Sequence, residues 1–102
     1  MTLGAILARL DDEAFVEETL AGIGDLVLVA RLRSAAAEAE EPLGSFVSAV
    51  VGHYVQHADG ERWLALMTAA GKASDPAAAC LHRMLLDAMA DERQEQAAPH
   101  RH

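Results

Sequence analysis

The chain has 102 residues, with 16 acidic and 8 basic side chains and a formal net charge of -8 at pH 7. This length accommodates a single domain. The acidic balance argues against a nucleic-acid binder, because neutralising phosphates requires a concentrated surface of lysine and arginine. Hydrophobic residues make up 52% of the chain, but 22 of them are alanine and only four are aromatic, a composition that favours closely packed helices over a β-sandwich.

The cysteine content and the N-terminal residues indicate the compartment. The single cysteine, Cys80, excludes an intramolecular disulfide framework and an all-cysteine zinc site. Residues 1–10 lack the basic start and the uninterrupted apolar run of a signal peptide or a membrane span. We therefore expect a soluble, cytoplasmic protein with no membrane partner. Seven arginines against one lysine, together with the many alanines, are typical of a GC-rich genome and indicate a bacterial origin.

The chain opens with a short predicted helix. Leucine and isoleucine recur at helical spacing over residues 3–10, and Thr2 is available as the N-cap. Asp11 or Asp12 then caps a second segment, whose acidic first turn offsets the positive end of the helix dipole. This segment extends to Glu40, because no turn signal interrupts its alanine-rich second half.

A pair of glycines interrupts this second segment. Gly22 and Gly24 each cost roughly 1 kcal/mol in a helix interior, and Asp25 directly afterwards could cap a new helix. Residues 12–40 therefore form either one long helix or two helices joined at a kink. We expect a single helix with a weak point at the glycines.

The third predicted helix has the most regular pattern in the chain. From Leu43 to Ala58, apolar residues fall at i, i+3, i+4 and i+7 and cover nearly half of the helix circumference. Pro42 separates this helix from the preceding one, since the residue before a proline disfavours the α region. A stripe of this width needs more than one neighbouring helix.

Two further helices follow. Asp59 and Gly60 start the fourth, for which Gly71 is the expected C-terminal cap. Asp75 as N-cap and Pro76 at the first helical position start the fifth. The short connection at Asp59 and Gly60 predicts a tight helical hairpin of the third and fourth helices.

These elements predict one all-α domain over residues 1–92, a compact bundle of four to five helices. The apolar periodicity stops near Glu92, so residues 93–102 are expected to form a polar, disordered tail. Several apolar residues lie off the main helical stripes, and their number exceeds what one small bundle needs. We therefore expect a homodimer that buries them. The expected interface residues are Leu28, Leu32, Leu66, Leu86 and Met89.

Two histidines are the clearest candidates for a binding site. His53 and His57 stand four residues apart on the third predicted helix, the spacing at which two imidazoles share one helix face. A metal would need further ligands, and nothing in the spacing shows that the fold brings any of the available ones near. Those side chains are Asp59, Glu61, Cys80 and His82. We therefore predict no metal site and interpret both histidines as residues at the edge of the apolar stripe.

The aromatic residues provide an alternative. Tyr54 and Trp63, together with His53 and His57, could line a small-molecule pocket between the third and fourth predicted helices. Packing in the core explains the two aromatic residues more simply. A ligand-binding site at these four residues therefore stays the second interpretation.

The sequence contains no complete catalytic motif. Cys80 and His82 lie two residues apart, and such residues point about 200° from each other on a helix, so the histidine cannot activate the thiol. Glycine-rich phosphate loops and the Gly-x-Ser-x-Gly motif are also missing from the sequence. We therefore assign no catalytic residue and expect no cofactor.

The sequence favours a small interaction module or accessory subunit over an enzyme. Its surplus of apolar helix surface suggests homodimerisation, or docking of an apolar helix face on a larger protein partner. Its acidic exterior keeps a small protein soluble. The alternative function is a small-molecule or metal-binding module that uses the third and fourth predicted helices.

Overall fold

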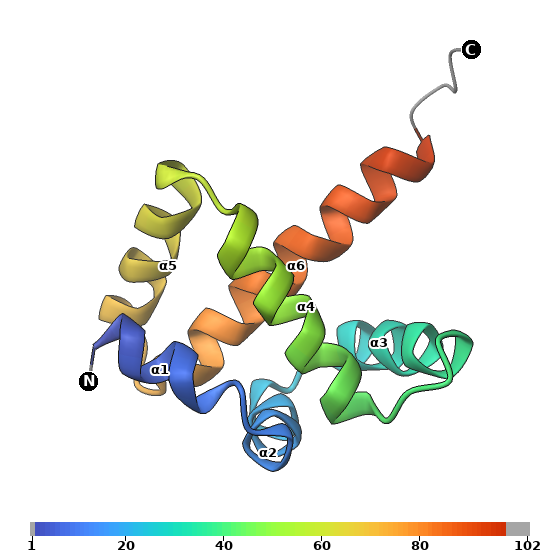
Figure 1. Cartoon of the computed structure of the whole chain (residues 1–102). Coiled ribbons are helices and arrows are strands. Elements are labelled where there is room, and N and C mark those ends of the chain that lie inside the picture. Colours follow the sequence, from blue (N-terminus) through green and yellow to red (C-terminus); the bar gives the residue numbers. More distant parts are fainter. Residues whose placement is uncertain (1, 98–102) are drawn as a thin grey trace.

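The computed structural model describes residues 2–97, with side chains for residues 2–90. This part of the chain forms six α-helices and no strand, which confirms the predicted all-α class (Figure 1). None of the described helices is long and apolar enough to cross a membrane. The helices are α1 (Leu3–Arg9), α2 (Glu13–Ile23), α3 (Leu26–Glu38), α4 (Leu43–His57), α5 (Gly60–Lys72) and α6 (Pro76–Ala97).

Four helices begin at side-chain caps that the sequence predicts. In each, a backbone amide of the first turn donates a hydrogen bond of 2.9 to 3.2 Å to the cap oxygen. These bonds satisfy amides that have no carbonyl partner within the helix. The caps are Thr2 for α1, Asp12 for α2, Asp59 for α5 and Asp75 for α6. The prediction of Gly71 as the C-terminal cap of α5 is wrong. The helix continues to Lys72, and its C-cap is Ala73, which has an extended backbone.

The expected single helix over residues 12–40 is also wrong, because α2 ends at Gly24. This glycine has a φ angle of 78°, a left-handed conformation that carries no Cβ penalty in glycine. Asp25 then caps α3 by accepting a 3.1 Å hydrogen bond from the amide of Leu28. Periodicity does not reveal the break, since the apolar residues keep a helical spacing on both sides of it. The described residues therefore form six helices, whereas four to five were expected.

The first half of α6 lies in the middle of the bundle. It packs against α5, α2, α4 and α1, while α4 also contacts α2 and α3 (Figure 1). Its inward side chains form the largest share of the core, and all of them are buried. These are Ala77, Cys80, Leu81, Met84 and Leu85. The other helices are therefore arranged around α6.

The helices α2 and α4 approach closely at Gly44. A Cβ atom at this position would lie 2.9 Å from the carbonyl oxygen of Glu13, which is closer than real Cβ contacts. The contact extends toward α1, where Ser48 donates a 3.2 Å hydrogen bond to the carbonyl of Leu10. The glycine thus lets α4 lie directly on the backbone at the start of α2.

Three residues expected at a dimer interface lie instead in the core of the single chain. Leu28, Leu32 and Leu66 are all buried by other helices of the same chain. The pattern misplaced them because α3 and α5 bury a side of the helix that the main apolar stripes did not include. Leu86 is partly exposed, and Met89 packs against the edge of the core. Only these two expected interface residues lie near the surface.

The boundary expected at Glu92 lies inside α6, which is continuous from Pro76 to Ala97. Residues 93–97 of the expected tail form the end of this helix, and residues 98–102 lie outside the described residues. Figure 1 shows that this end of α6 projects beyond the other helices.

The two glycines at the helix break provide a matched pair of substitutions. Gly22→Ala should raise the free energy of unfolding by roughly 0.5 to 1 kcal/mol, because Gly22 is helical and has open space around its Cβ position. Gly24→Ala should lower it by about 1 kcal/mol, because alanine is strained at a positive φ. Urea denaturation measures both. Equal stabilisation by the two substitutions would contradict the break at Gly24.

Candidate functional site

An apolar groove lies between α3 and α6. It has a volume of about 290 Å³ and is open to solvent. The helix α3 packs on α4, whereas the first half of α6 packs on α2, α4 and α5, and the two helices diverge from the middle of the molecule (Figure 1). The groove is lined by Asp25, Val27, Leu28 and Arg31 from the side of α3 and by Leu86, Met89 and Ala90 from α6.

The walls of the groove expose large apolar side chains. Val27 on α3 is 68% exposed, and Leu86 on α6 is 40% exposed. Leu28 forms the buried floor and connects the groove to the core. Three of the expected interface residues, Leu28, Leu86 and Met89, therefore line one groove, although only Leu86 exposes much of its side chain.

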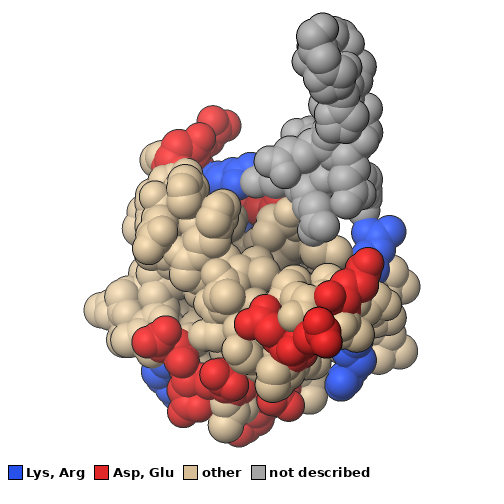
Figure 2. All heavy atoms as spheres, turned by 45° about the vertical axis from the view of Figure 1, so that its right-hand side comes forward, with Lys and Arg blue, Asp and Glu red and all other residues tan. Residues whose placement is uncertain are grey.

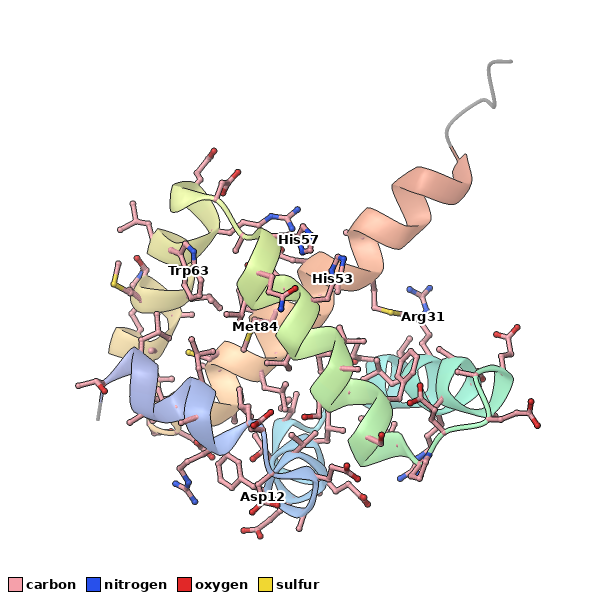
Figure 3. All side chains as sticks on the ribbon, in the orientation of Figure 1. Asp12, Arg31, His53, His57, Trp63 and Met84 are labelled. Atoms are coloured by element: carbon pink, nitrogen blue, oxygen red, sulfur yellow. The ribbon has the colours of Figure 1, made fainter. Side chains whose placement is uncertain are left out.

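One cation lies at the rim of this groove. Figure 3 shows the side chain of Arg31 rising from α3 into the space between α3 and α6. Among residues 2–90, no carboxylate forms a salt bridge with this guanidinium. The rim can thus supply a hydrogen-bonding positive charge to whatever occupies the groove.

Asp25, which lines the groove, contacts His82 on α6. His82 Nε2 donates a 2.9 Å hydrogen bond to Asp25 Oδ2, and both side chains are partly exposed. The same carboxylate caps α3 through the amide of Leu28. The hydrogen bond from His82, followed by that from Leu28, holds the pKa of Asp25 below its ordinary value of 3.8. Asp25 therefore determines both the start of α3 and its attachment to α6.

A second polar contact joins α4 to α6. The buried Tyr54 hydroxyl donates a 2.9 Å hydrogen bond to Asp87 Oδ2, and Arg83 Nη2 donates a 2.6 Å bond to Asp87 Oδ1. The guanidinium of Arg62 lies 5.7 Å from the centre of the tyrosine ring. Burial, reinforced by the bond to Asp87, raises the pKa of Tyr54 to about 12. Tyr54 is thus held in the core by a satisfied hydrogen bond.

The four residues of the alternative ligand site are divided between α4, which carries His53, Tyr54 and His57, and α5, which carries Trp63. The rings of His53 and His57 stack 4.2 Å apart on the exposed surface of α4, and His57 Nδ1 donates a 2.9 Å bond to the His53 carbonyl. In the view of Figure 3, Trp63 lies on α5, on the opposite side of α4 from these rings. None of the four residues lines the groove between α3 and α6 or the two hollows beside α2.

Metal and thiol chemistry receive little support from the geometry. Within the part of the chain whose side chains are described, no three His, Cys, Asp or Glu residues gather to hold a metal ion. Cys80 is fully buried, with its Sγ 3.8 Å from the carbonyl oxygen of Leu66. Burial raises the pKa of this thiol, which keeps it protonated and unreactive.

The single tyrosine makes the Tyr54 contact directly measurable. We expect the tyrosinate absorbance of the folded protein to titrate with a midpoint of about 12, against 10.0 for an ordinary tyrosine. Because the pKa is raised on folding, stability from this group is complete below pH 10 and decreases as the pH rises toward 12. A midpoint near 10 in protein that is still folded by circular dichroism would contradict the buried hydrogen bond.

The Asp25 contact predicts an acid-dependent loss of stability. Because the pKa of Asp25 is lowered on folding, its contribution is present above pH 3.8 and decreases as the pH falls through the lower folded value. Asp25→Asn, which retains a capping oxygen, should therefore destabilise the protein more at neutral pH than in acid. Urea denaturation at several pH values tests this. The difference should shrink in a His82→Ala background, and an unchanged difference would exclude His82 as its main cause.

Comparison of the chain with protein-family models, curated proteins and solved structures gives no match. The interpretation therefore depends on the contacts of the chain itself. Among the described residues, the groove between α3 and α6 combines an open volume, exposed apolar walls and a cation at its rim. Three of the expected interface residues, Leu28, Leu86 and Met89, also line it, and we therefore take this groove as the candidate functional site.

Proposed function

We propose that this protein is a small cytoplasmic interaction module that self-associates through the groove between α3 and α6. The observation that carries the proposal is the exposure of large apolar side chains on both walls, Val27 on α3 and Leu86 on α6. Removing such surface from water contributes about 25 cal/mol per Å². Burial of these walls by a partner would therefore stabilise the complex.

The spacing of the wall residues suits a helix as the occupant. Val27 and Arg31 lie four residues apart on α3, and Leu86, Met89 and Ala90 follow at i, i+3 and i+4 on α6. Each set forms a ridge along one helix face, and a third helix can place its own ridge between two such ridges. Docking of an amphipathic helix into an apolar groove is a recurrent mode of protein recognition.

The cytoplasmic part of the proposal rests on cysteine chemistry. Cys80 is the only cysteine of the chain, and it is buried as a free thiol. The fold is therefore maintained by packing and hydrogen bonds, without a disulfide framework of the kind that oxidising compartments favour.

Sedimentation equilibrium tests the proposal with two charge-matched variants. The mean mass of the wild-type protein should rise above 10.8 kDa with increasing concentration. Leu86→Glu should stay at 10.8 kDa, because a charge in the groove wall opposes burial. Ala49→Glu, at an exposed position of α4 that does not line the groove, should associate like the wild-type protein.

Two results would refute self-association through this groove. One is a wild-type protein that stays monomeric up to millimolar concentration. The other is a Leu86→Glu variant that associates as well as the wild-type protein while its melting temperature is unchanged. Leu86 lies at the surface, so the substitution should leave folding nearly intact.

A further inference from the structure

The outer face of α5 carries a second exposed apolar surface. Leu64 is 60% exposed and Met67 is 52% exposed, and residues three apart lie on the same side of a helix. The opposite side of α5 buries Leu66 and packs against α6. Leu64 and Met67 are not needed by the core, and we call them the α5 stripe.

The α5 stripe and the groove have complementary shapes. The stripe is the convex side of one helix, whereas the groove is a hollow between two helices. Figure 1 shows α5 and α3 at opposite ends of the bundle, with α4 and α6 between them. One chain therefore cannot place its own stripe into its own groove, and only a second copy can bring the two surfaces together.

The charges at the two surfaces also match. Glu61 is exposed three residues before Leu64 on α5, and Arg31 is exposed four residues after Val27 on α3. Each charge thus lies about one helical turn from the apolar centre of its surface. Among residues 2–90, no salt bridge involves either of these two side chains.

The strong negative charge of the chain restricts which surface can dock. Figure 2 shows an uncharged area between groups of acidic side chains on the face turned forward from the α3 side of Figure 1. A docking face rich in carboxylates would be repelled there. On the exposed side of α5, the charged residues are Glu61 and Lys72, one of each sign. The exposed side of α5 therefore adds no excess of negative charge to the contact between two copies, each with a net charge of -8.

We propose that the groove between α3 and α6 of one copy receives the α5 stripe of a second copy. Leu64 and Met67 lie against the apolar walls, and Glu61 pairs with Arg31. The inference rests on the proposed function and adds the occupant of the groove. Because each copy offers one groove and one stripe, the contact can repeat head-to-tail from copy to copy, and association can continue beyond a dimer. The contact involves few side chains, so association should be weak and concentration-dependent.

A mixing experiment distinguishes this pairing of groove and stripe from a dimer in which two grooves meet. Leu86→Glu disables the groove, and Leu64→Glu disables the stripe, so each variant alone should be monomeric in sedimentation equilibrium. An equimolar mixture should form a complex that stops at two chains, because one variant retains an intact stripe and the other an intact groove. A mixture of Leu86→Glu with Val27→Glu, which both alter the groove, is the control and should stay monomeric.

The outcomes test separately whether the groove is an interface and whether the α5 stripe is its occupant. If Leu86→Glu prevents association but Leu64→Glu does not, the groove is an interface and the α5 stripe is not its occupant. If each variant is monomeric and their mixture stays monomeric, the head-to-tail arrangement is overturned. If neither substitution changes the mass of an associating protein, both proposals fail.

A charge exchange tests the orientation of the contact. Arg31→Glu and Glu61→Arg should each weaken association, because each places like charges opposite one another. The double variant should restore association toward the wild-type level, since it re-forms the pair with reversed polarity. Melting temperatures of all three variants should stay close to that of the wild-type protein, because both side chains are exposed. Failure of the double variant to recover would overturn the pairing of Glu61 with Arg31.

Discussion

One carboxylate, Asp25, determines where α3 lies, and the groove depends on that position. It follows the left-handed Gly24, caps α3 through Leu28 and accepts a hydrogen bond from His82 on α6. With a straight connection between α2 and α3, Val27 and Leu86 would not form facing walls. A local change of chain direction and one long-range hydrogen bond thus create the candidate site together.

The central position of α6 explains how a small chain can form a stable core and still expose apolar residues. The first half of α6 is surrounded by other helices and buries alanine, leucine, methionine and cysteine side chains. Its polar contacts to neighbours are satisfied, and no side-chain nitrogen or oxygen buried among residues 2–90 lacks a partner. Leu86 follows the fully buried Leu85 on a different side of α6, and it is exposed there.

Local signals predicted much of the fold, and long-range contacts account for the errors. The caps Thr2, Asp12, Asp59 and Asp75 were predictable, because a cap depends on residues only a few positions away. The bond between Asp25 and His82 joins residues 57 positions apart, and no sequence signal connects them. The burial of Leu28 and Leu66 was missed for a related reason, since periodicity shows which residues are apolar but not how many sides of a helix are covered. Leu86 and Met89 line the groove, and this groove depends on the direction of α3, which no local sequence signal indicates.

The buried thiol of Cys80 can be used to measure internal motion of the protein. It is the only thiol in the chain, has no exposed surface and lies against the backbone of α5 at Leu66. A thiol reagent can reach the sulfur only when the core around it opens, and the contact of α6 with α5 at Leu66 is part of that core. The rate of its labelling in the native protein therefore measures how often the core opens at this point, without an added probe.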